Sequence, residues 1–198
     1  MFFPTPYCSI VPPYLLRRLA AQSEPELSTA ARAAKEALHH VPSFQASRAI
    51  PSPVALPGMR ELKPSPPERT VYDAKFAERL PGTVVRKEGE PPTGDPAADE
   101  AYDGLGDTHR LYAEAFGRNS IDGNGLHLDA TVHYGRLYDN AFWDGQQMVF
   151  GDGDGQVFER FTKSLSVIGH ELTHGVTQYS AGLVYRNQAG ALNESMSD

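Results

Sequence analysis

The stretch His170-Glu171-Leu172-Thr173-His174, near the end of the chain, determines how the rest of the sequence is interpreted. In a helix, His170 and His174 stand four residues apart and project from the same face. Two imidazoles on one face can bind a single metal ion, and Glu171 places a carboxylate next to them. The opposite face is expected to pack on a core, because it carries apolar residues at steps of three and four: Leu165, Ile168, Leu172, Val176 and Tyr179.

A second motif, Asn193-Glu194-Ser195-Met196-Ser197-Asp198, follows after a break at Ala181-Gly182. A helix over this motif would place Glu194 and Asp198 on one face, because they are four residues apart. Glu194 then offers a third metal ligand. We expect Asp198 to accept a hydrogen bond from His170 and so to fix the tautomer of that ring.

Two histidines and one glutamate form the ligand set of a catalytic zinc site. They leave the fourth tetrahedral position of zinc open for water, whereas a structural site would be closed by one more protein ligand. The motifs therefore predict zinc held by His170, His174 and Glu194. Glu171 is expected to act as the general base that takes a proton from the water, which makes the expected reaction the hydrolysis of peptide bonds.

Other segments of the chain, in addition to these two motifs, resemble segments of a known protein family. The chain resembles the thermolysin family of zinc metalloendopeptidases in both motifs and in residues 140–143, 148–155 and 181–185, in the same order. The resemblance implies an α+β fold, the N-terminal domain of a thermolysin-like zincin with an antiparallel β-sheet and a long active-site helix. The metzincin alternative requires a glycine and a histidine where Thr177 and Ser180 stand, so it is excluded.

The resemblance also implies roles for residues outside the metal motifs. It makes Tyr185 a hydroxyl donor to the oxyanion of the reaction, and it places residues 140–143 on an edge strand of the active-site cleft. There the Asn140 side chain and the Ala141 backbone would hold an extended peptide substrate. Without the resemblance, this segment is equally well an ordinary strand end with a buried Trp143, and Tyr185 a core aromatic residue.

Two acidic residues between glycines, Asp152 and Asp154, raise the question of Ca²⁺ as a second cofactor. No glutamate stands at the closing position of a calcium loop, so a tight turn is favoured. Calcium-rich relatives also carry an aspartate where this chain has Ser166. The single histidines His109 and His133 are expected to be structural, as is His127.

The N-terminal third has a different composition from the rest. Residues 1–41 predict a small helical module, with a helix over 14–21 and a second helix from Ser28 to His40 that ends at Pro42. Residues 42–68 predict a linker that contains the processing site, since residues 42–67 hold seven of the sixteen prolines. Residues 69–198 are expected to form the N-terminal part of the catalytic domain.

The segment from Cys8 to Leu15 resembles the prosegments of protealysin-like members of the family. This resemblance implies a removable propeptide that acts as the enzyme's own inhibitor. One hypothesis is that the Cys8 thiolate, or the extended segment around it, occupies the open zinc position. The alternative is that Cys8, the only cysteine, is a small buried apolar residue.

Within the catalytic part, short segments alternate in predicted structure. Residues 70–72 and 83–86 are expected to form strands of an antiparallel meander, followed by an amphipathic helix over 97–116. Residues 122–125 (Asp-Gly-Asn-Gly) predict a turn before a strand over 126–134. The family resemblance implies a further helical domain after Asp198, so the chain is expected to be a fragment with little activity of its own.

Composition limits the classes of partner. A formal net charge of −7 argues against nucleic acid, and no apolar segment approaches the ~20 residues needed to span a bilayer. The N-terminus lacks the features of a secretory signal, which favours the cytoplasm, whereas the family resemblance favours secretion. The competing functional hypothesis is a catalytically inactive module that binds zinc or peptides without cleaving them.

Overall fold

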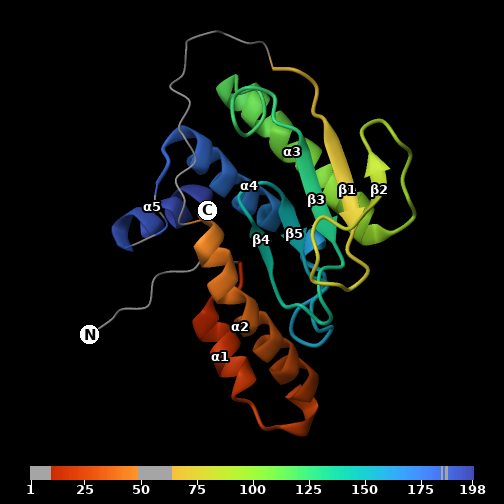
Figure 1. Ribbon diagram of the computed structural model, residues 1–198, viewed down its shortest axis with the longest axis vertical. Helices are drawn as coiled ribbons and strands as arrows, with labels where there is room; N and C mark the ends of the chain where they lie inside the picture. The colour runs from red at the N-terminus through yellow and green to blue at the C-terminus, as the bar shows by residue number, and fades with distance from the viewer. Residues whose placement is uncertain (1–9, 49–63, 184, 186) are drawn as a thin grey trace.

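The structure is a computed structural model, and it describes residues 10–48, 64–183, 185 and 187–198. Two helices, α1 (Pro13–Ala20) and α2 (Ser28–Arg48), form an N-terminal hairpin (Figure 1). The remaining helices and strands lie between residues 69 and 198: β1 (Arg69–Asp73), β2 (Thr83–Lys87), α3 (Pro96–Phe116), β3 (Leu128–Val132), β4 (Ala141–Trp143), β5 (Met148–Phe150), α4 (Leu165–Ser180) and α5 (Asn187–Ser197). No helix in these described ranges has the length and apolar character needed to cross a membrane.

The five strands form one sheet in the order β2-β1-β3-β5-β4. β1 pairs with β2 in antiparallel fashion, and so does β4 with β5, but β3 runs parallel to both β1 and β5. The predicted α+β class is therefore confirmed, whereas the sheet is mixed and not antiparallel. Sequence periodicity marks strands without giving their partners, which explains the error. β4 lies at the edge of the sheet, as expected for residues 140–143.

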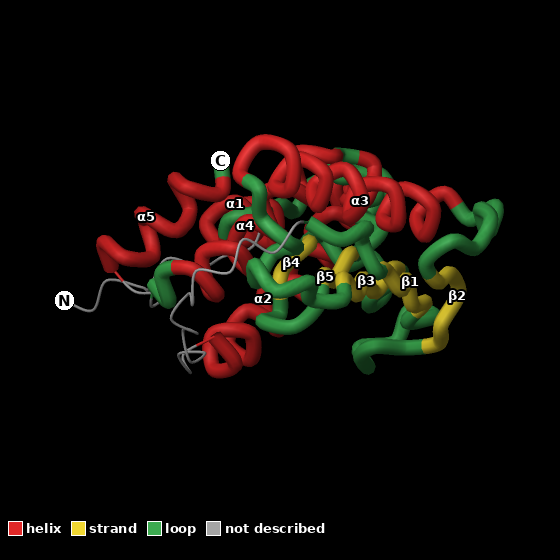
Figure 2. Tube along the Cα trace, turned by 90° about the horizontal axis from the view of Figure 1, so that it is seen from above, coloured by secondary structure: helices red, strands yellow, loops and turns green. Residues whose placement is uncertain are grey.

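Helices α3 and α4 cover one face of the sheet, as Figure 2 shows from above. Gly104 makes the close packing of these two helices feasible, because a Cβ at this position would lie 2.3 Å from Cδ1 of Ile168 in α4. Ile168 and Leu172 are buried on the core side of α4, as predicted from the row of apolar residues on that face of the helix. Leu165, the first residue of the same apolar row, is instead 52% exposed, because it is the first residue of the helix.

Helix α2 does not end before Pro42 as predicted, but continues to Arg48. A proline inside a helix removes one hydrogen bond and introduces a clash, yet no further proline or glycine follows until Pro51. Packing against α1 fixes the first half of the helix, where Ala30, Ala34 and Ala37 are buried. The first seven residues of the predicted 42–68 linker are therefore helical. Residues 49–63 of this linker, which was expected to contain the processing site, lie outside the described residues.

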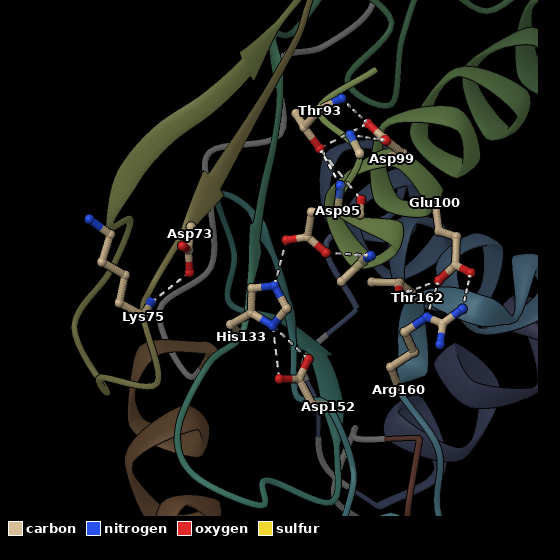
Figure 3. A network of polar contacts seen from close by, with 12 residues as sticks. Asp73, Lys75, Thr93, Asp95, Asp99, Glu100, His133, Asp152, Arg160 and Thr162 are labelled. Atoms are coloured by element: carbon tan, nitrogen blue, oxygen red, sulfur yellow. Dashed lines mark hydrogen bonds and ion pairs between the residues drawn. The ribbon is translucent and has the colours of Figure 1, made fainter.

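A charged network joins α3 to the sheet (Figure 3). His133 follows β3 with a left-handed backbone (φ 53°), and its Nδ1 lies 2.8 Å from Asp152 while Nε2 lies 2.7 Å from Asp95. Asp95 also accepts a hydrogen bond from the Ala97 N–H and so caps α3. The hydrogen bond to Asp152, together with that to Asp95, raises the pKa of His133 to about 9 despite burial. His133 is therefore an imidazolium at neutral pH with a structural role.

Replacing His133 by Asn should lower stability in a pH-dependent way, since Asn tolerates the left-handed backbone but carries no charge. Because the folded-state pKa of His133 is raised, its stabilisation is fully present below about pH 6.5 and is lost as pH rises through about 9. We expect the free energy of unfolding to fall by on the order of 2 kcal/mol at pH 6, after allowance for partial exposure. Urea unfolding at pH 6 and pH 10 measures this, with His127→Asn as control. An equal loss at both pH values would contradict it.

Candidate metal centre and peptide-binding edge

Helix α4 brings His170, Glu171 and His174 together, and all three are buried. Helix α5 packs against α4 and adds Glu194. Each of His170, His174 and Glu194 offers one ligand atom, and these atoms all lie within 4.8 Å of one another. The structure thus brings together the three residues that were predicted as metal ligands from segments twenty residues apart.

The hydrogen bonds of the two histidines aim their free nitrogens at one point. Nδ1 of His170 lies 2.9 Å from Asp198 Oδ1, and Nδ1 of His174 lies 2.8 Å from Asn193 Oδ1, so both Nδ1 atoms act as donors. Both Nε2 atoms then carry lone pairs, and they face each other at 3.1 Å. Two lone pairs and a carboxylate that converge in this way repel unless a cation lies between them. The residues present therefore fit a divalent metal ion bound by nitrogen and oxygen.

The electrostatic environment of this cluster favours positive charge. Burial, the largest influence on His170, lowers its pKa, but the hydrogen bond to Glu194 and the charges of Glu171 and Asp198 together raise it above the ordinary value. Glu194 Oε2 lies 3.3 Å from His170 Nε2. The side chain of Asp198 is 79% exposed, so water screens much of its charge. A metal ion would replace the proton that these carboxylates attract to His170.

Glu171 lies beside the predicted metal ligands and is hydrogen-bonded to the edge strand. It is fully buried, and its Oε2 accepts a hydrogen bond of 2.9 Å from the backbone N–H of Trp143 in β4. The indole N–H of Trp143 in turn donates to Gln178 Oε1, and Gln178 Nε2 donates to the Gly145 carbonyl. Helix α4 therefore contacts β4 through two side chains that lie two helical turns apart, Glu171 and Gln178. This arrangement fixes the distance between the carboxylate of Glu171 and the edge strand β4.

A segment of the same chain already occupies the edge at Asn140 and Ala141. Asn140 Oδ1 accepts a hydrogen bond from the Val11 N–H at 3.1 Å, and its Nδ2 donates to the Val11 carbonyl at 3.4 Å. The Ile10 N–H points to the Ala141 carbonyl at 3.4 Å. These are the side-chain and main-chain groups that were expected to hold an extended peptide. The N-terminal segment thus contacts the edge as an added peptide would.

The other predicted residues lie at different distances from the cluster. The ring of Tyr185 lies edge-on to His174, with 5.8 Å between ring centroids, so it borders the predicted metal ligands. Asp154 forms the predicted tight turn, because its Oδ1 accepts the backbone N–H groups of Gln156 and Val157. Asp152 instead bonds to Nδ1 of His133. Cys8 lies outside the described residues.

Three residues at the site, Asn193, Ser197 and Gln178, were given no role from the sequence. Asn193 and Ser197 both bond to Nδ1 of His174, at 2.8 and 3.0 Å. Their spacing of four on α5, on the same face as Glu194, was the available indication. Gln178 likewise stands seven residues after Glu171, and hence on the same face of α4.

Comparison with known sequences identifies the family. Residues 68–178, more than half of the chain, match the catalytic domain of the thermolysin metallopeptidases. The chain belongs to the thermolysin metallopeptidase family. It is similar to an extracellular metalloprotease of Pectobacterium carotovorum subsp. carotovorum, with 49% identity over 98% of this chain and 54% of that protein. It is also similar to the protease PrtS of Photorhabdus sp. (strain Az29), with 45% identity over 97% of this chain and 51% of that protein.

A solved structure extends the similarity to the N-terminal module. The precursor of protealysin, a metalloproteinase from Serratia proteamaculans, matches with a TM-score of 0.79 and 45% identity over 96% of this chain and 52% of that chain. A thermolysin of Alicyclobacillus acidocaldarius subsp. acidocaldarius matches 64% of this chain at 48% identity. The thermolysin-like fold and the precursor character are thereby confirmed. This thermolysin-family chain spans about half the length of the precursor and of the two longer-matching relatives.

Proposed function

We propose that the chain is the precursor and N-terminal catalytic half of a zinc-dependent endopeptidase. The observation that carries this proposal is the convergence of two imidazole lone pairs and the Glu194 carboxylate, next to a buried Glu171. His170, His174 and Glu194 would hold the zinc ion. When bound, zinc supplies a Lewis acid and lowers the pKa of a coordinated water.

Other side chains of this protein would transfer the proton, stabilise the oxyanion and align the substrate. Glu171 takes the proton of the attacking water and returns it to the leaving amine, and its bond to the Trp143 N–H keeps the carboxylate in place. Tyr185 donates a hydrogen bond to the oxyanion that develops at the scissile carbonyl. Asn140 and the Ala141 backbone align the peptide as an additional strand, as they align Ile10 and Val11. Asp198 and Asn193 orient the two histidines.

Cleavage of an internally quenched peptide tests the proposed reaction. Because the chain spans about half the length of its relatives, we expect the chain alone to cleave slowly. A fusion to the C-terminal half of the Pectobacterium relative should restore turnover, and removal of zinc by a chelator should abolish it. Peptide binding at the β4 edge without cleavage by the fusion would favour the alternative of an inactive binding module.

We further propose that the N-terminal module keeps the enzyme latent by occupying the substrate's edge strand. Ile10 and Val11 use the hydrogen-bonding groups of Asn140 and Ala141, so a substrate cannot bind there until the module leaves. The Cys8 thiolate, two residues before Ile10, is the further group proposed for the open zinc position.

One relative is named an extracellular metalloprotease, and we propose the same destination for this chain, with the cytoplasm as the alternative.

Replacing Cys8 by Ser separates the two sources of latency. If the thiolate binds zinc, the unprocessed fusion with Ser at position 8 should gain at least about tenfold in initial rate, because an alcohol is a weak zinc ligand. Rates are compared before any processing, as judged by gel electrophoresis, with Ser9→Ala as the neighbouring control. Unchanged latency would reject the thiolate and leave the strand contact as the inhibitor.

A further inference from the structure

Two buried carboxylates, Asp139 and Asp154, lie next to the segments that hold the N-terminal module. The side chain of Asp139 is fully buried and Asp154 is 7% exposed. Neither oxygen of Asp139 nor Oδ2 of Asp154 makes a well-formed hydrogen bond among the described residues, and the backbone N–H of Asp154 favours the charged form of Asp139 less than burial opposes it. A buried, ionised carboxylate without a donor is strongly unfavourable, and a second one beside it adds repulsion. The pair is therefore stable only if a cation or a proton is shared between them.

A shared proton accounts for this pair better than a metal ion does. Together the two side chains offer three open oxygens, whereas calcium takes six to eight oxygen ligands. The nearest further carboxylate on the loop, Asp152, is bonded to His133. Burial raises the pKa of Asp139, and the negative charge of Asp154 and a hydrogen bond with it raise the pKa further, to about 8. We therefore expect Asp139 to be the partner that carries the proton, with Asp154 as the acceptor of its hydrogen bond.

The two carboxyl groups connect the two places where the N-terminal module is bound. Asp139 directly precedes Asn140, which bonds Val11 through two atoms. Asp154 stands two residues before Gln156, whose side chain accepts from the Ala30 N–H at 3.1 Å and donates to the Glu26 carbonyl at 3.1 Å. The two segments are also joined by main-chain bonds, such as that from the Gly151 N–H to the Asn140 carbonyl.

We propose that Asp139 is a positioning residue: in its protonated form it bonds to Asp154 and holds Asn140 and Gln156 where the N-terminal module binds, so loss of this proton releases the module and frees the edge strand. This inference rests on the proposed role of that edge as the peptide-binding site. It adds a regulatory input, since latency then weakens as pH rises, without any change at the metal ligands. Protonation is the whole of the chemistry, because no covalent bond is made or broken.

The direction of the pH dependence follows from the raised pKa of Asp139. Release of the module lets water reach the carboxyl group, so its pKa should return toward 3.8. Docking is then fully favoured below about pH 4 and weakens by up to tenfold per pH unit as pH rises toward 8. Other charged groups near these segments, among the described residues, include the Asp152–His133 pair and, around the pocket beside Tyr138, Arg32, Glu36, Glu78 and Arg136.

Hydrogen exchange of the Val11 amide measures docking in the chain as it is, without zinc or substrate. In the unaltered chain, the protection factor, corrected for the intrinsic exchange rate, should fall more than tenfold between pH 5 and pH 8. Asp139→Asn retains a donor toward Asp154 but cannot ionise, so protection should become independent of pH and remain high at pH 8. Asp154→Asn removes the other charge and should flatten the profile as well, which provides a second variant if the first does not fold.

Matched controls separate this proposal from its alternatives. Asp129→Asn removes another partly buried carboxylate, on β3, and should leave the pH profile of Val11 unchanged. Protection in the unaltered chain that does not change with pH, or an unchanged slope in Asp139→Asn, would overturn the proposal. Recovery of protection at pH 8 on addition of Ca²⁺ would also overturn it, in favour of a cation site. Failure of the fusion to cleave peptides, with the Val11 profile as expected, would reject the peptidase proposal alone.

Discussion

Replacing His174 by Ala should abolish stoichiometric zinc binding. The side chain contributes one of three proposed ligand atoms, and its Nε2 lies 3.1 Å from that of His170. Loss of a group that only orients a zinc ligand costs about 10- to 100-fold in affinity, so loss of a ligand should cost more than about 100-fold. The two remaining ligands would leave two coordination positions for water, which is too few protein contacts to hold the metal during dialysis.

Metal analysis after dialysis at pH 7.5 measures this effect directly. The unaltered chain should retain about one zinc per molecule, as expected for one three-ligand site. His127→Ala is the matched control, because this histidine directly precedes β3 and its side chain bonds to Thr70 in β1. Retention of zinc by the His174 variant, or loss in the His127 variant, would show that the ion is held elsewhere.

Replacing Glu171 by Gln should remove peptide hydrolysis and leave zinc binding intact. The amide oxygen of Gln can still accept the hydrogen bond from the Trp143 N–H, so the geometry of the edge strand is preserved. An amide cannot take a proton from water at neutral pH. General bases contribute about 10²- to 10⁴-fold to rate, and we expect kcat/KM of the fusion to fall by at least about 10³-fold.

The comparison requires a glutamate that lies away from the site. Glu159→Gln serves this purpose, because Glu159 is an exposed surface residue that pairs with Lys163. The control should keep both full activity and full zinc content. Activity of Glu171→Gln within tenfold of the unaltered fusion would reject its role as base, and loss of zinc in this variant would indicate that Glu171 is a ligand.

The parts of the fold that were predictable from sequence are those governed by local spacing. His170 and His174 share a helix face because they are four residues apart, and the same spacing aligned Glu194 with Asp198. The helix over 97–116 is bounded by Asp95 and by Gly117 in a left-handed conformation, both of which are local preferences. The edge position of residues 140–143 came from the family resemblance and is confirmed.

The features that were missed depend on contacts between distant segments. The parallel pairing of β3 with β1 joins residues far apart in sequence, and no local pattern encodes it. The pair of Asp139 and Asp154 likewise arises only when the loop after β5 folds back on the segment before β4. Helix α2 extends past Pro42 although local propensity opposes it. For the strand pairing and for the pair of carboxylates, tertiary contacts determine the outcome.

The pairing of Asn140 with Val11 links latency to substrate binding through one set of atoms. The same hydrogen-bonding groups would serve the propeptide before processing and the substrate after it. Helix α4 holds this edge through Glu171 and Gln178, so the peptide and the proposed base are positioned by one element. One helix therefore holds both the proposed metal site and the proposed peptide-binding edge.

A crystal structure of the chain grown with zinc, with anomalous scattering recorded at the zinc edge, tests the central claim most directly. The proposed site predicts one strong anomalous peak at about 2.0–2.2 Å from Nε2 of His170, Nε2 of His174 and a carboxylate oxygen of Glu194. A sulfur atom of Cys8 in the fourth position would be compatible with this result. A zinc peak bound by other side chains, or no peak between these three residues, would contradict the assignment of this chain as a zinc peptidase precursor.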